Sequence, residues 1–126
     1  NVPSLLSMPY IGYCDADDRI YQNTRRFVLS EKNPFYYTGS CLRGIGSPHT
    51  EKGFVWPISL VIQALTSNNA EEIETVISML KSTHADTLCM HESINANNQY
   101  EYTRSWFAWA NSLFSELILK YVGRDK

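Results

Sequence analysis

The segment FVWPISLVIQALT, residues 54–66, carries apolar side chains around almost its whole circumference if it is helical. Pro57 suits the first turn of a helix, so this pattern predicts a helix over residues 57–66. Because a helix that is hydrophobic on all faces is buried on all faces, we expect this element at the centre of the structure.

The segment that follows has a different pattern. Asn69 can cap a helix, and Glu72 stands three residues further on, as in a capping box. Apolar residues then recur at helical spacing, namely Ile73, Val76, Ile77 and Leu80. The sequence therefore predicts a second helix, with one buried side and one side exposed to solvent.

Helices are also expected further out along the chain. Residues 19–29 follow an acidic turn that we interpret as a helix cap, since the glycine and distal glutamate of a calcium loop are missing. Residues 103–121 have Thr103 as a possible cap and apolar residues on all sides, so this helix should be largely enclosed. Asn1 to Pro9 is expected to hold a short helix.

This order of helices predicts an all-α fold. In a simple bundle every helix would be amphipathic, whereas enclosed helices that alternate with half-exposed ones are typical of an α/α toroid. The segments 44–49 and 84–102 are rich in glycine or polar residues, so we expect them to be irregular loops. A chain of 126 residues holds too few helices to close a toroid, so it is expected to be a fragment.

Composition excludes several classes of function. The net charge is −2 with no basic face, which argues against nucleic-acid binding, and no apolar run reaches transmembrane length. The cysteines and histidines form neither a CxxC nor an HExxH pattern, so the sequence predicts no disulfide framework, no metal site and no cofactor.

The strongest candidate for chemistry is the tetrapeptide Met90-His91-Glu92-Ser93, which joins an imidazole, a carboxylate and a hydroxyl. A carboxylate with bulky apolar neighbours is suited to proton transfer, which makes Glu92 a candidate acid or base. A solvated loop carboxylate beside a packed histidine is the alternative.

Several segments together resemble a known family. They are 1–6 (NVPSLL), 21–27 (YQNTRRF), 44–49 (GIGSPH), 90–93 (MHES) and 106–114 (WFAWANSLF). In the same order they resemble glycoside hydrolase family 125, the metal-independent exo-α-1,6-mannosidases. The resemblance implies that residues 1–126 are the C-terminal portion of a single catalytic domain with an (α/α)6 barrel fold, whose N-terminal part is absent. It also implies a mannose-containing glycan as the ligand.

The resemblance assigns roles to individual residues. Glu92 lies in the His-Glu-Ser motif and would be the general base of an inverting mechanism. His49, His91, Arg25 and Trp106 lie in matching motifs and are candidates for substrate binding. The family's acid is an aspartate upstream of the matched segment, so the chain by itself is expected to be inactive.

Two other hypotheses remain open. The chain could be a non-catalytic helical fragment that acts by self-association or by binding a partner. It could also belong to another α/α-toroid carbohydrate hydrolase or lyase, and in a lyase Arg25 or Arg26 would neutralise a uronate carboxylate.

Overall fold

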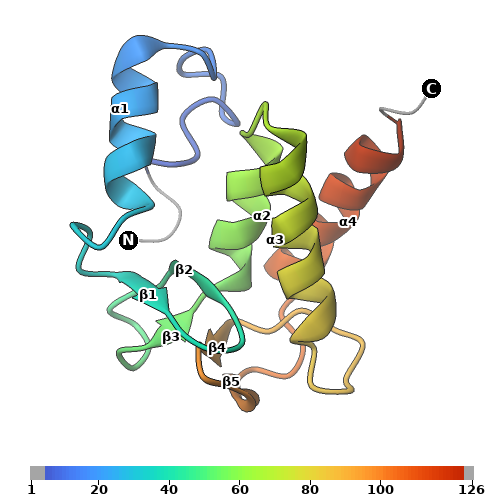
Figure 1. Ribbon diagram of the computed structural model, residues 1–126. Coiled ribbons are helices and arrows are strands. Elements are labelled where there is room, and N and C mark those ends of the chain that lie inside the picture. Colours follow the sequence, from blue (N-terminus) through green and yellow to red (C-terminus); the bar gives the residue numbers. More distant parts are fainter. Residues whose placement is uncertain (1–4, 124–126) are drawn as a thin grey trace.

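The pair of helices α2 (Pro57–Leu65) and α3 (Ala70–Ser82) forms the centre of the computed structural model, which describes residues 5–123 (Figure 1). Every residue of α2 except Gln63 is buried. Asn69 caps α3, because its side chain accepts hydrogen bonds from the backbone N–H of Glu71 and Glu72 at 2.9 and 3.2 Å. Both helices were predicted from their apolar patterns.

Helix α1 (Arg19–Val28) lies to one side of this pair, and α4 (Ala108–Gly123) packs against α2 on the other (Figure 1). Asp18 caps α1 by accepting a hydrogen bond from the N–H of Tyr21 at 2.9 Å, so the interpretation of the acidic turn as a cap is confirmed for this residue. Residues 5–12 form turns instead of the expected helix, and residues 1–4 lie outside the described part of the chain.

The prediction of an all-α fold, and with it the α/α toroid, is wrong. Within residues 5–123 the chain has five strands in two small antiparallel sheets, so the fold is mixed α and β. One sheet pairs β1 (Tyr36–Thr38) with β2 (Arg43–Ile45). The other has the order β3-β4-β5, with β3 at Phe54–Val55, β4 at Ser93–Asn95 and β5 at Asn98–Thr103. The strands gather at one end of α2, α3 and α4 (Figure 1).

Glycines allow the two sheets to approach each other closely. A Cβ on Gly39 would collide with the backbone of Ala96, and one on Gly46 would collide with the carbonyl oxygen of Phe54. The segment 44–49 was expected to be an irregular loop, but its first two residues belong to strand β2, and Gly46 follows that strand directly.

Helix α4 begins five positions later than the sequence suggested. Thr103 is the last residue of β5, where its hydroxyl lies 2.6 Å from that of Ser93, so it is not available as a helix cap. The helix is also less enclosed than expected, because only Ala110 and Leu117 are buried. Trp109 and Leu119 are 70% and 75% exposed.

None of the helices within the described residues combines the length and the apolar character needed to cross a bilayer.

Candidate active site

The segment Met90–Ser93 is hydrogen-bonded to the end of β5 and to the connection between β5 and α4. The N–H of Phe107 donates to the carbonyl oxygen of Met90 at 3.1 Å, and the N–H of Glu92 donates to that of Thr103 at 3.2 Å. The hydroxyl of Ser93 lies 2.6 Å from that of Thr103. These bonds fix the backbone of Glu92 from both sides.

Extended backbone points successive side chains to opposite sides, and this alternation separates the three residues of the His-Glu-Ser motif. His91 and Ser93 are completely buried. Glu92 lies between them and keeps a partly exposed side chain at the wall of a surface cavity. In this motif the carboxylate of Glu92 therefore points towards the surface, and the buried side chains of His91 and Ser93 hold the segment in place.

The imidazole of His91 makes contacts only inside the protein. Its Nδ1 and Nε2 atoms lie 3.0 and 3.2 Å from the carbonyl oxygens of Ser105 and His84. The ring also stacks on Tyr102, with centroids 4.0 Å apart and planes at 11°. In this structure His91 orients the segment that carries Glu92, and it does not line the cavity.

The cavity beside Glu92 has a volume of about 520 Å³. Three parts of the chain line it: residues 49–51 of the loop after β2, Phe54 at the start of β3, and residues 100–103 of β5. His49 and Glu92, which are far apart in the sequence, thus line the same cavity. Antiparallel pairing of β3 with β4 brings their two segments together.

A hydrogen-bonded turn fixes the position of His49. The hydroxyl of the buried Ser47 accepts a hydrogen bond from the backbone N–H of His49 at 3.2 Å. The carbonyl oxygen of Ser47 accepts a second hydrogen bond, from the backbone N–H of Thr50 at 3.3 Å. Thr50 is held in turn by the indole N–H of Trp56, 2.9 Å from its hydroxyl. His49 itself is exposed at the cavity rim.

The charges around the cavity are mostly negative. Glu51, Glu92 and Glu101 all line it, and the side-chain amide of Asn95 donates to Glu101 at 2.8 Å. Glu92 differs from the other two because it forms an ion pair, in which Nε of Arg104 lies 3.1 Å from Oε2 of Glu92. A carboxylate held in this way beside an open cavity can accept a proton from a water molecule or a ligand hydroxyl.

Arg25 lies in a different part of the structure, between α1 and the α2–α3 pair. Its guanidinium donates to Glu72 and to the hydroxyl of Thr66 at 2.7 Å each, and to the carbonyl oxygen of Gln63 at 2.9 Å. Burial disfavours the charged form of Glu72, but a hydrogen bond from Ser67, the charge of Arg25 and a hydrogen bond from Gln63 outweigh this effect and lower its pKa. Arg25 is buried and does not line the cavity beside Glu92.

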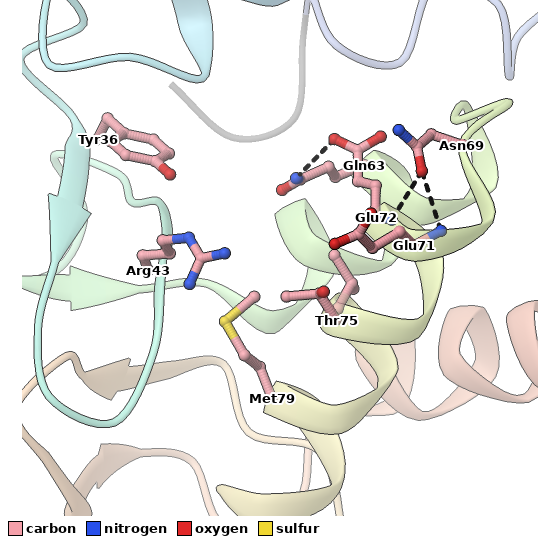
Figure 2. Close-up of a pocket in the computed structure, with 9 residues that line it drawn as sticks. Tyr36, Arg43, Gln63, Asn69, Glu71, Glu72, Thr75 and Met79 are labelled. Atoms are coloured by element: carbon pink, nitrogen blue, oxygen red, sulfur yellow. Dashed lines mark hydrogen bonds between the residues drawn. The ribbon is translucent and has the colours of Figure 1, made fainter.

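A second cavity lies between the β1–β2 hairpin and α3 (Figure 2). Its polar groups include Arg43, Tyr36 and Glu72, but Glu72 is bound by Gln63 at 3.1 Å as well as by Arg25. Asn69, at the far wall, is occupied as the cap of α3 (Figure 2). Glu72 and Asn69 are thus occupied within the fold, so the cavity beside Glu92 is the better candidate.

Trp106 is 65% exposed and precedes α4, outside the set of residues that line the cavity. The next residue, Phe107, packs edge-on against Trp56 with ring centroids 6.2 Å apart. Among the candidates for ligand contact, the structure brings His49 to Glu92, whereas Arg25, His91 and Trp106 lie away from the cavity surface.

The sequence interpretation missed Arg104 and the strand that positions it. Residues 93–95 and 98–103 flank a two-residue turn at Ala96-Asn97, which is the usual length of a tight β-hairpin. Tyr100 and Tyr102 belong to a type that is common in strands. A regular hairpin with that turn would have paired Glu92 with Glu101, because Asn95 pairs with Asn98. The irregularity between Ile94 and Asn95 shifts the register so that Ser93 pairs with Thr103, and this shift places Arg104 beside Glu92.

Within residues 5–123, no group of three or more histidine, cysteine, aspartate or glutamate side chains is arranged to hold a metal ion.

Comparisons with known proteins give consistent results. Residues 1–119 match the model of the Metal-independent alpha-mannosidase (GH125) family. The chain is 50% identical over 125 residues to the Meiotically up-regulated gene 157 protein of Schizosaccharomyces pombe, covering 98% of this chain and 25% of that protein.

It is also similar to a solved structure from Streptococcus pneumoniae, described as a metal-independent alpha mannosidase in a non-productive complex with alpha-1,6-mannobiose. The TM-score is 0.94 at 46% identity, over 98% of this chain and 29% of that one. The chain therefore spans between a quarter and a third of the length of these relatives. By its match to the family model, the chain belongs to the metal-independent α-mannosidase family GH125.

Proposed function

We propose that this chain supplies the general base of an exo-acting α-1,6-mannosidase that hydrolyses its substrate with inversion. The observation that carries this proposal is the arrangement of Glu92, whose carboxylate is fixed at the wall of a cavity of about 520 Å³ with one oxygen bound by Arg104. Membership of GH125 supports the class of reaction. The α-1,6-mannobiose bound to the Streptococcus pneumoniae relative supports the choice of linkage.

In an inverting hydrolysis Glu92 removes a proton from a water molecule as that water attacks the anomeric carbon. A second carboxyl group protonates the leaving oxygen from the opposite face of the sugar, and such pairs stand roughly 6.5–9.5 Å apart to admit the water. His49, at the rim of the same cavity, is proposed to contact the sugar hydroxyls.

We also propose that the chain is the C-terminal part of a single, longer catalytic domain, and that the acid lies in the remainder of that domain. The coverage of 25% and 29% of the matched relatives supports this proposal. The α4 region supports it too, because it presents Trp106, Trp109, Leu119 and Val122 to solvent. Large apolar side chains exposed along one helix provide surface that can pack against another part of a protein.

The test is the substitution Glu92→Gln in the full-length protein, with release of mannose from α-1,6-mannobiose as the assay. Loss of the base should lower kcat by about 10²–10⁴-fold, because that is the usual contribution of general base catalysis. Glu31→Gln is the matched control, since Glu31 is exposed in the turns after α1 and does not line the cavity. Near-normal turnover by Glu92→Gln would show that the base lies elsewhere.

Two further measurements test the finer parts of the proposal. NMR of the first product formed should show β-mannose, because inversion of an α-linkage gives the β-anomer. The isolated 126-residue chain should release no mannose, because it lacks the proposed acid. Turnover by this chain would refute the assignment of the acid to the remainder of the protein.

A further inference from the structure

The residue that pairs with Glu92 has an unusual backbone conformation. Arg104 has a φ of 49°, in the left-handed region that residues other than glycine rarely adopt. It directly follows β5, in the connection to α4. Such conformations persist only where the surrounding structure imposes them, and they often occur at functional sites.

The surrounding structure does impose this conformation, because both neighbours of Arg104 are tied to the His-Glu-Ser segment. On one side the carbonyl oxygen of Thr103 accepts the N–H of Glu92 at 3.2 Å. On the other side the carbonyl oxygen of Ser105 lies 3.0 Å from Nδ1 of the buried His91. The segment that carries Glu92 thus also fixes the residue that binds its side chain.

The side chain of Arg104 leaves one oxygen of Glu92 available. Nε of Arg104 bonds to Oε2 at 3.1 Å, whereas Oε1 has no hydrogen-bond partner among residues 5–123. The side chain of Glu92 is only 18% exposed, while that of Arg104 is 66% exposed. A charge-assisted hydrogen bond of this kind restricts rotation of the carboxylate.

We propose that Arg104 is a positioning residue, which holds the carboxylate of Glu92 in place through Oε2 so that Oε1 takes the proton of the attacking water. This inference rests on the proposed role of Glu92 as the base. Arg104 itself neither gains nor loses a proton in this step. Its effect is on how often the base is correctly oriented when the water attacks.

The test uses two substitutions in the full-length protein. Arg104→Asn removes the charge but keeps a residue that tolerates a positive φ, whereas Arg104→Lys keeps the charge and loses the geometry of Nε. For Arg104→Asn we expect kcat to fall by about 10- to 100-fold with little change in KM, as expected when a catalytic group is misplaced. Arg104→Lys should retain part of the rate, because it keeps the positive charge beside the carboxylate.

Controls separate this effect from a loss of structure. Arg26→Asn, at an exposed position on α1, should leave kcat and KM unchanged. Arg104→Gly also accepts a positive φ, so it repeats the test with a second residue that has no charge. The melting temperature of each variant shows whether the fold is retained.

Glu92→Gln and the double variant Glu92→Gln/Arg104→Asn complete the experiment. If Arg104 acts through Glu92, the double variant will be no slower than Glu92→Gln alone. An inactive Glu92→Gln together with a wild-type kcat in Arg104→Asn and Arg104→Gly would overturn this inference and leave the proposed function standing. A rise in KM alone would also overturn it, because that result shows contact with the sugar. An active Glu92→Gln would overturn the proposed function.

Discussion

Replacing Arg25 by Met should separate α1 from the α2–α3 pair. The substitution keeps an unbranched apolar side chain but removes the guanidinium, which donates to Thr66, Gln63 and Glu72 at 2.7–2.9 Å. The side chains of Arg25 and Glu72 are 9% and 28% exposed, so the carboxylate would be left partly buried without its cation.

The size of the effect follows from this burial. Removal of one partner of a buried ion pair costs about 3–5 kcal/mol, and the partial exposure of Glu72 places this pair at the lower end, about 3 kcal/mol. In a domain of 126 residues this loss corresponds to a fall in melting temperature of roughly 10 °C. Arg26→Met is the matched control, since Arg26 is exposed on the same helix and should change stability little.

The assay is urea denaturation of the purified chain at low protein concentration, repeated over a range of pH. The pKa of Glu72 is lowered in the folded protein, so the stability that ionised Glu72 contributes is present above its ordinary value of 4.5 and is lost as the pH falls through the lower folded value. The difference between wild type and Arg25→Met should therefore shrink below about pH 4.5. A difference below about 1 kcal/mol at pH 7, or one that grows in acid, would refute the argument.

Two further predictions concern packing. Gly46→Ala should lower the free energy of unfolding by about 2 kcal/mol in urea denaturation, since its Cβ would meet the carbonyl oxygen of Phe54 and the ring of Tyr37, which is overpacking. Gly123→Ala, with open space around its Cβ, is the control, and equal effects would contradict the argument. The isolated chain should self-associate in sedimentation experiments, and Trp109→Ser with Leu119→Ser should reduce this association, because both side chains are exposed on α4. A monomeric wild-type chain would show that the exposed apolar side chains of α4 do not drive association.

The sequence predicted the helices well where a residue typical of helix starts is followed by apolar residues at helical spacing. Pro57, Asn69 and Asp18 mark the starts of α2, α3 and α1, and each structural boundary lies within a residue of the expected one. The start of α4 was misplaced because Thr103 has the chemistry of a cap but pairs with Ser93 in a sheet. Local propensity cannot reveal a partner that is distant in the sequence.

The strands were missed for a related reason. Each has two to six residues, too few for a clear alternation of apolar and polar side chains, and their polar and glycine residues are typical of loops. The expectation of an all-α fold followed from this omission, because residues 44–49 and 84–102 were expected to be irregular loops.

For the site, residue type and motif were enough to select Glu92 and His49, which line one cavity. The directions of the side chains were not predictable, because they depend on strand register. A shift of one residue would have turned His91 towards the cavity and Glu92 into the core. The ion pair with Arg104 depends on the same register, so it too became visible only in the structure.

The two walls of the cavity differ in how much chain must be ordered to build them. Glu92 and Arg104 are joined through the β4–β5 hairpin, whose two-residue turn closes with little loss of chain entropy. His49 reaches them only through the pairing of β3 with β4, which must first enclose both α2 and α3. Amide exchange should therefore show the hairpin as a local cooperative unit that stays closed while the His49 loop opens. Glu92 and Arg104 would then stay together during partial unfolding. The loop that carries His49 would have to return to its position each time the protein refolds locally.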